Sequence, residues 1–183
     1  IPFLHALNNE IVGLQQQYES ECRAAIGDYQ YRHAQHGYKP FSIGSRDHLA
    51  QLFFQHLKIQ GDGVLKLTPK GKREEISEEI LEPYRKTHPA VGPVIEWHKA
   101  EKLRNTYTDP LQLLVDSDSR LHTTFNATVA ATGRLSSSNP NLQNIPVRTK
   151  LGKRIRAAFV ASTGRGLVSV DMAQIEMVWA AHR

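Results

Sequence analysis

The chain has 183 residues, a formal net charge of +5 and 40% apolar residues, and its mean hydropathy of −0.44 is typical of a globular chain with a modest core. It contains no run of about 18 apolar residues, which excludes a predicted membrane-spanning helix, and no basic-then-apolar leader is visible. Cys22 is the only cysteine, which excludes an internal disulfide, and no Cys/His pattern has zinc spacing. Because the first residue is Ile1 and not Met, we expect the chain to be part of a longer one.

The N-terminal part of the sequence predicts a series of helices. Apolar residues recur at alternating three- and four-residue steps over residues 3–26, which indicates one long helix with a core-facing stripe. A second helix is expected to begin after an N-cap at Ser45 and to reach Leu57. Residues 60–75 are rich in Gly and Lys and indicate an exposed loop.

Two further helices are expected before the character of the sequence changes. Ser77 is a candidate N-cap for a short helix that ends before Pro89. Residues 94–107 predict another helix, and Thr108-Asp109-Pro110 is predicted to end it, because the residue before a proline disfavours the helical conformation.

From about residue 115 onward the pattern favours β structure and loops. LHTTFNATVAA (121–131) alternates loosely, TGRLSSSNPNLQNIPVRT (132–149) is loop-like, and GLVSV (166–170) predicts a final buried strand. We therefore expect a fold class that is mostly α with a small β part. A helical subdomain would cover residues 1–118, and the beginning of a mixed α/β subdomain would cover residues 119–183.

Charge is distributed unevenly along the chain. Residues 119–170 contain no Asp or Glu but eight Lys or Arg residues, so the rest of the chain is net negative. A surface without carboxylates suits a polyanion, because each carboxylate there would repel phosphate. A basic face that binds nothing is the alternative interpretation.

Residues 132–146, TGRLSSSNPNLQNIP, have the composition of a linker, since Ser, Asn, Pro and Gly favour turns. The same segment also places amide and guanidinium groups among apolar residues, which we expect to anchor the loop and direct the amides outward. Such donors suit the DNA minor groove, where every base pair presents hydrogen-bond acceptors. A protein that binds these acceptors can check the shape of a base pair without reading its sequence. The polar residues concerned are Arg134, Asn139, Asn141, Gln143 and Asn144, and the apolar ones are Leu135, Leu142 and Ile145.

Asp171 follows the predicted final strand and has two interpretations. An Asp at an N-cap with Gln174 three residues later makes a capping box. Alternatively, the carboxylate at the end of the strand binds a metal ion that handles phosphates. Glu176 lies about one helical turn further on and is either a solvated surface charge or part of the same site.

ATGRLSSSNPNLQNIPVRTKLGKRIRAAF followed by VSVDMAQIEM resembles the family A DNA polymerases, the DNA polymerase I type. The resemblance is strongest over residues 121–176, and KLRNTYTDPL and FSIGSRDHLAQLFF resemble the thumb of that family more weakly. It implies a helical thumb-like subdomain over residues 1–118 and the beginning of the palm, through the first catalytic aspartate motif, over residues 119–183. It also implies DNA-directed DNA polymerase activity by two-metal-ion nucleotidyl transfer, in DNA replication and repair.

The resemblance implies roles for individual residues. Asp171 would be catalytic and would bind Mg²⁺ together with the backbone carbonyl of Met172. Gln174, Glu176 and Arg148 would lie by the incoming deoxynucleoside triphosphate, with Glu176 as the steric gate against a ribose 2′-hydroxyl. The implied DNA-binding residues are Lys102, Arg104, Arg134, Asn141, Gln143 and Asn144.

The sequence departs from the family's pattern in several places. Met172 and Ala173 stand where Tyr and Ser are usual, and Val178 stands where Arg is common. The second metal-binding aspartate, in a His-Asp-Glu motif, and the fingers helix do not occur in the chain. The resemblance therefore implies a polymerase fragment that is inactive by itself.

The partners expected from the resemblance are primer–template DNA, deoxynucleoside triphosphates, and a second chain or missing C-terminal segment carrying the fingers and the remaining palm, with no membrane. The cofactor would be Mg²⁺ at a two-metal site only partly present in this chain. We expect a cytoplasmic location in a bacterial or phage-infected cell, with an organelle as the alternative. The alternative function is a non-catalytic primer–template-binding module or a subunit of a split polymerase.

Overall fold

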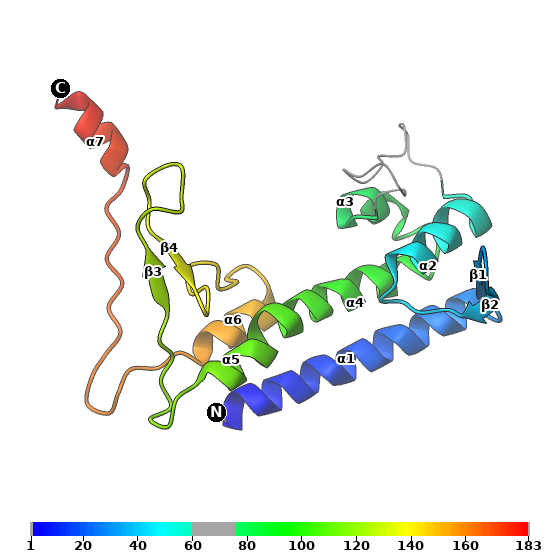
Figure 1. Ribbon diagram of the computed structural model, residues 1–183, viewed down its shortest axis with the longest axis horizontal. Helices are drawn as coiled ribbons and strands as arrows, with labels where there is room; N and C mark the ends of the chain where they lie inside the picture. Colours follow the sequence, from blue (N-terminus) through cyan, green and yellow to red (C-terminus); the bar gives the residue numbers. More distant parts are fainter. Residues whose placement is uncertain (1, 60–75, 183) are drawn as a thin grey trace. The chain divides into compact units, whose positions relative to one another are not determined.

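The computed structural model describes residues 2–59 and 76–182 (Figure 1). Within these residues the chain is mostly helical with a small β part, as the sequence predicted. Two compact units are present, Ile1–Ile145 and Pro146–Arg183, and each is described by itself. The exposed loop predicted for residues 60–75 lies outside the described residues. None of the helices described here is both long and apolar enough to cross a bilayer.

Two long helices pack side by side in the first unit (Figure 1). Helix α1 (Pro2–Ile26) confirms the helix predicted for residues 3–26, and α4 (Val91–Leu103) runs along it. Polar contacts reinforce the packing, because Arg104 Nη1 donates to Gln15 Oε1 at 2.7 Å and Thr108 Oγ1 donates to Asn8 Oδ1 at 2.5 Å. The buried apolar residues of α1 are Leu4, Leu7, Ile11 and Cys22.

The helical segment after α4 does not end at Asp109-Pro110, so that prediction was wrong. The chain passes through a π-helical turn, η3 (Arg104–Thr108), directly into α5 (Asp109–Leu114). Pro110 is the second residue of α5 and directly follows this π-helical turn, in which the Asp109 N–H donates to Arg104 O. Asp109 keeps helical φ and ψ angles of −67° and −55°.

A hairpin that the sequence did not predict lies between α1 and α2. Strand β1 (Gln30–His33) pairs antiparallel with β2 (Gly37–Pro40). Gly37 has a φ of 70°, a backbone conformation that glycine adopts more readily than residues with a side chain.

The predicted second helix is confirmed. Helix α2 (Arg46–Ala50) begins after Ser45, whose hydroxyl oxygen accepts from the His48 N–H at 3.5 Å. It continues as the π-helical segment η1 (Gln51–His56).

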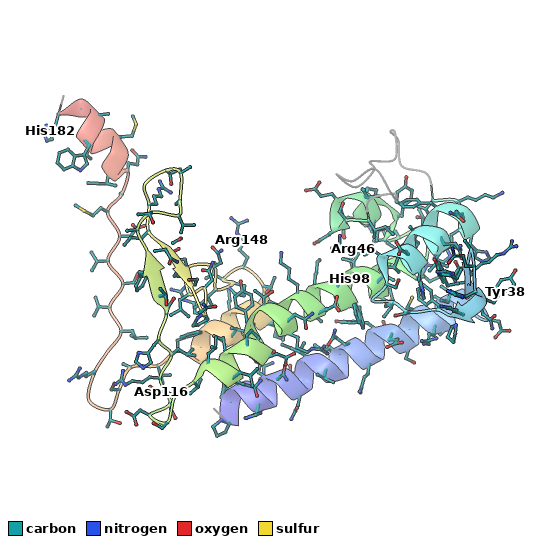
Figure 2. All side chains as sticks on the ribbon, viewed as in Figure 1. Tyr38, Arg46, His98, Asp116, Arg148 and His182 are labelled. Carbon is teal, nitrogen blue, oxygen red and sulfur yellow. The ribbon has the colours of Figure 1, made fainter. Side chains whose placement is uncertain are left out.

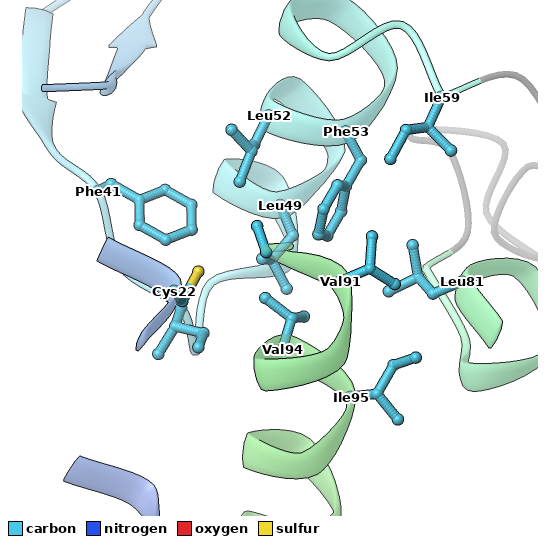
Figure 3. Close-up of a cluster of buried hydrophobic side chains, with 12 residues drawn as sticks. Cys22, Phe41, Leu49, Leu52, Phe53, Ile59, Leu81, Val91, Val94 and Ile95 are labelled. Atoms are coloured by element: carbon cyan, nitrogen blue, oxygen red, sulfur yellow. The ribbon is translucent and has the colours of Figure 1, made fainter. Parts of the chain in front are cut away.

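The core of the first unit lies between α1, α2, η1 and α4, and Figure 3 shows the buried side chains of these helices converging. Phe53 of η1 is its largest fully buried side chain. Helix α3 (Glu78–Leu81) and the 3₁₀ turn η2 (Glu82–Tyr84) confirm a short helix before Pro89 and contribute Leu81. Ser77 occupies the predicted N-cap position, although its side chain makes no capping hydrogen bond.

A second small sheet follows α5. Strand β3 (Thr124–Asn126) confirms the β structure predicted within residues 121–131. Its antiparallel partner β4 (Ser136–Ser138) lies in the stretch predicted as a loop. Three consecutive serines carry no alternating pattern, so only the pairing with β3 makes this segment a strand.

The second unit contains α6 (Lys150–Ala157) and α7 (Ile175–Ala181). Residues 166–170 between them do not form the predicted buried strand. Leu167, Val168 and Val170 are 72%, 86% and 86% exposed. A strand needs a hydrogen-bonded partner, and the described part of the chain provides none for this segment.

Candidate nucleic-acid interface

The loop that follows β4 is organised around one buried hydroxyl group. Ser137 is 4% exposed. Its Oγ accepts from Leu142 N at 3.0 Å and from Gln143 N at 3.4 Å, and it donates to Asn141 Oδ1 at 3.2 Å. The chain therefore folds back on itself over residues 137–143 in a single defined turn, which includes a cis Asn139–Pro140 peptide bond.

Gln143 binds the edge of β4 in the way that a neighbouring strand would. Its Oε1 accepts from Ser137 N at 3.1 Å, and its Nε2 donates to Leu135 O at 3.0 Å. The side chain thereby supplies hydrogen bonds that an open strand edge would otherwise lack.

These contacts differ from the arrangement that the sequence predicted. Leu135, expected to be an anchor, is 57% exposed, and Leu142 and Ile145 are only partly buried. Asn141 and Gln143 are exposed, as expected, but their amides also hold the loop together through hydrogen bonds within it. Backbone groups in a tight turn need partners, and nearby amides supply them. A DNA-binding role for these two residues stays a prediction.

The other predicted DNA-binding residues of this region lie close by in the chain. Arg134 is exposed just before β4, and Asn144 is exposed at the end of the loop. The Tyr107 hydroxyl donates to the Asn144 backbone carbonyl, which connects the loop to η3. Arg134, Asn141, Gln143 and Asn144 therefore belong to one hairpin-and-loop substructure within the first unit.

The two predicted thumb cations differ in their surroundings. Arg104 binds Gln15 through Nη1, and its Nε lies 3.3 Å from Asp109 Oδ2 without a hydrogen bond of good geometry. Its charge therefore serves the packing of η3 against α1 and the beginning of α5. Lys102 is exposed on α4, so it is the better placed of the two to meet a phosphate.

Lys102 lines a cavity of about 410 Å³ in the first unit, and Figure 2 shows Arg46 and His98, which also line it. His98 Nδ1 lies 3.3 Å from Glu101 Oε2. Burial lowers the pKa of His98, and the nearby Glu101 carboxylate opposes that shift. The cavity therefore combines a half-buried imidazole with nearby cations. Its other polar lining residues are Ser77, Glu78, Lys99 and Asn105.

The turn between α5 and β3 depends on Asp116, which the sequence did not single out. Its Oδ1 accepts from Arg120 N at 2.8 Å and from Asp118 N at 2.9 Å, and its Oδ2 lies 2.8 Å from His122 Nε2. These donors, the Arg120 N–H first, lower the pKa of the Asp116 carboxyl. The turn sets the direction in which the chain enters β3.

The second unit contains the densest group of cations in the acid-free segment. Thr149 caps α6 by accepting from Gly152 N at 3.0 Å, and Arg148 is exposed just before this cap. Gly152 and Ile155 are buried, and a Cβ on Gly152 would lie 2.7 Å from Pro146 Cβ. The basic residues of the helix are Lys150, Lys153, Arg154 and Arg156.

Asp171 and Met172 are exposed in an irregular segment before α7. The predicted capping box is wrong: the N-cap of α7 is Gln174, which has a φ of 52° and makes no side-chain capping bond. The helix begins too far along the chain for Asp171 to reach its first N–H groups. Glu176 belongs to α7, but its side chain lies outside what the structure describes.

No three His, Cys, Asp or Glu side chains form a metal-binding group in the described parts of the chain. The Asp171 carboxylate and the Met172 carbonyl nevertheless fit Mg²⁺ in kind. This ion prefers oxygen ligands and is commonly held by one or two carboxylates together with substrate phosphates.

Comparison with known proteins places this arrangement in a family. A profile described as DNA polymerase family A matches residues 12–183. The chain belongs to DNA polymerase family A. Among family A relatives, the thermostable DNA polymerase I of Thermus thermophilus is 45% identical over all 183 residues, and the DNA polymerase I of Deinococcus radiodurans is 45% identical over 143 residues, or 78% of this chain. The chain spans 20% of the first relative and 15% of the second.

A solved family A structure has a similar fold. It is the POL domain of Pol1 from M. smegmatis in complex with DNA primer-template and dNTP. The TM-score is 0.75 at 34% identity, over 89% of this chain and 26% of that chain.

Some residues that shape this family A chain were not found from the sequence. Gln15 stands one turn after Ile11 on the apolar stripe of α1, and a polar residue on a core-facing stripe indicates a buried partner. Ser137 stands in a Ser-Ser-Ser-Asn-Pro-Asn run, where hydroxyl-to-backbone turns are common. These signals indicate that a partner exists but do not identify Arg104 or Leu142 as that partner.

Proposed function

We propose that this chain is the part of a DNA-directed DNA polymerase that holds the primer–template and supplies the first carboxylate of the catalytic site. Residues 1–118 would act as the thumb and residues 119–183 as the beginning of the palm. The observation that carries the proposal is the ordered loop around Ser137, which lies within a segment, residues 119–170, that contains no acidic residue. A polymerase needs such a surface, because it must hold duplex DNA without reading its sequence.

The hydrogen bonds inside the loop determine which of its polar groups can still bind DNA. Gln143 uses both its Oε1 and its Nε2 inside the loop, so we assign it a positioning role. Asn141 uses Oδ1 internally, so its Nδ2 is the donor that it can offer to purine N3 or pyrimidine O2 in the minor groove. Arg134 and Asn144 would bind the same groove, and Lys102 would bind backbone phosphates, with Arg104 supporting it through the helix contacts.

The catalytic contribution of the chain would come from the segment around Asp171. The Asp171 carboxylate and the Met172 carbonyl would hold Mg²⁺, which when bound stabilises negative charge on the transferring phosphoryl group. Arg148, Gln174 and Glu176 would lie beside the deoxynucleoside triphosphate, and Glu176 would exclude a ribose 2′-hydroxyl. As relatives of this chain are bacterial proteins, we expect it to act in the bacterial cytoplasm.

The test separates catalysis from DNA binding. The chain would be combined with a second chain that carries the family's remaining palm and fingers, and primer extension would be measured together with primer–template affinity. Asp171→Ala should abolish extension and change DNA affinity less than twofold, because one exposed carboxylate contributes little to phosphate binding. Asp28→Ala, which removes another exposed carboxylate, is the matched control and should change neither quantity.

Two outcomes would contradict the proposal. Extension that survives Asp171→Ala would remove the metal-binding role, and loss of DNA affinity in that variant would mean that the residue supports the fold or the DNA surface instead. We expect the 183-residue chain alone to bind primer–template in a salt-dependent manner and not to extend it.

A further inference from the structure

The β1–β2 hairpin presents a solvent-facing surface that the proposed function does not use. Side chains alternate between the two faces of a ladder. Tyr31 and His33 of the inner face are half-buried, whereas Tyr38 on the outer face is 68% exposed. Figure 2 shows Tyr38 at the outer edge of the hairpin. The outer face consists of Gln30, Arg32, Tyr38 and Pro40, all of which are exposed.

The hairpin is anchored on both its edge and its inner face. Gln51 of η1 accepts from Arg32 N at 2.7 Å through Oε1 and donates to Arg32 O at 3.1 Å through Nε2. The Tyr29 hydroxyl donates to the same Oε1 at 3.2 Å. On the inner face, the Tyr31 and His48 rings stack with centroids 3.9 Å apart and planes 16° from parallel. The outer face therefore has a set orientation on α2 and η1.

The anchoring also determines how Arg32 and Tyr38 face each other. The two residues are directly opposite in the ladder. Since both backbone groups of Arg32 bind Gln51, this is the non-hydrogen-bonded type of pair, in which the Cα atoms are only about 4.5 Å apart. A guanidinium group and an aromatic ring therefore project from adjacent positions on the exposed face.

The hairpin segment itself carries cations and no carboxylate, although Asp28 precedes it and Asp47 follows it. Residues 29–46 contain no Asp or Glu, whereas Arg32, Lys39 and Arg46 are cationic. The His33 and His36 rings stack at 4.6 Å beside the turn. Cations that alternate with exposed rings suit a partner that carries both phosphates and flat bases.

We propose that the outer face of the β1–β2 hairpin binds a single-stranded polynucleotide, with Arg32 at a phosphate and Tyr38 stacked on an unpaired base. A single strand suits this face better than a duplex, because only an unpaired base offers its ring to a protruding tyrosine. A protein strand added to the edge of β1 does not fit, since it would need the Arg32 N–H and C=O that Gln51 already binds. The surface shares no residue with the primer–template loop and does not depend on the catalytic role of Asp171.

The experiment measures fluorescence anisotropy of the 183-residue chain with a labelled oligothymidylate and with a duplex of equal length, over a series of salt concentrations. Tyr38→Ala should weaken single-strand binding about 5- to 150-fold, the range for one stacked base, and Tyr38→Phe should retain it. Arg32→Gln should lower the magnitude of the salt slope by about 0.7, the value for one phosphate contact on a single strand. Lys86→Gln, which removes an exposed cation outside the hairpin, is the matched control and should leave the slope unchanged.

Photo-crosslinking with an iodouracil-substituted oligonucleotide locates the contact. Crosslinks at Tyr38 that persist in an Arg134→Ala variant would support a site separate from the primer–template loop. Equal single-strand affinity of wild type, Tyr38→Ala and Arg32→Gln would overturn the inference while leaving the proposed function intact. Hairpin-dependent binding of the duplex alone would also overturn it. These substitutions lie on exposed positions, and circular dichroism would verify that each variant keeps its helices.

Discussion

Replacing Ser137 by alanine is expected to release the loop after β4 while the rest of the first unit stays folded. The hydroxyl oxygen accepts from Leu142 N at 3.0 Å and from Gln143 N at 3.4 Å. Gln143 N keeps a second acceptor, Asn141 Oδ1 at 3.1 Å. The substitution therefore removes the acceptor of the Leu142 N–H and only one of two acceptors of the Gln143 N–H.

The expected magnitude follows from these contacts. A donor left unpaired in a buried position costs about 1–3 kcal/mol. Leu142 is only partly buried, so water reaches part of this site and the cost falls in the lower part of that range. We expect the free energy of local opening to fall by about 1–2 kcal/mol, which corresponds to an opening equilibrium about five to thirty times larger.

Amide hydrogen exchange measured residue by residue tests this prediction. The Leu142 and Gln143 amides of Ser137→Ala should exchange about five to thirty times faster, while amides in α1 and α4 keep their wild-type rates. Primer–template affinity should fall in parallel, because the loop then holds its groove-binding donors in many conformations. Ser136→Ala removes a hydroxyl from the same strand, one that has no hydrogen-bond partner among the described residues, and should change neither measurement. Unchanged exchange at Leu142, or an equal effect of Ser136→Ala, would refute the role of the Ser137 hydroxyl.

Three further predictions concern the stability of the first unit. Phe53→Ala should lower the free energy of unfolding by about 3–5 kcal/mol, because it empties the centre of the core; a urea titration that shows a loss below 1 kcal/mol would contradict this packing. Burial lowers the pKa of His98 in the folded chain, so the unfolded chain binds the proton first and stability should fall as the pH drops below about 6.5. His98→Gln should flatten that dependence, and an unchanged slope in thermal melts between pH 5 and 8 would exclude His98 as its source. Burial raises the pKa of the Cys22 thiol to about 11, so Ellman's reagent at pH 8 should modify it only after denaturant is added, and rapid modification of the folded chain would show that the thiol is accessible.

Local signals in the sequence were sufficient for several elements. The stripe over residues 3–26 predicted α1, because apolar spacing repeats with the helix and needs no knowledge of the partner. Ser45 marked the beginning of α2 because an N-cap acts on backbone groups only three residues away. The absence of carboxylates over residues 119–170 is likewise a property of the chain itself and does not depend on folding.

Contacts between distant residues decided the parts that were predicted wrongly or not at all. Residues 166–170 have a strand-like composition, but pairing requires a second strand, and the described residues hold none beside them. Ser136–Ser138 has the composition of a loop and yet forms β4, because β3 supplies its partner. The local effect of Pro110 predicts a helix end, whereas its actual place near the beginning of α5 depends on where the preceding π-helical turn ends.

By itself, the sequence determined the mostly helical class, the acid-free basic segment and the resemblance to family A, which the profile match confirms. Only the tertiary structure showed that Gln143 and Gln51 each bind a strand edge, so that one holds the loop after β4 and the other orients the β1–β2 hairpin. The physical reason is that an amide side chain satisfies whichever backbone groups folding brings to it. Composition and spacing record the presence of that amide, and the three-dimensional path of the chain selects its partner.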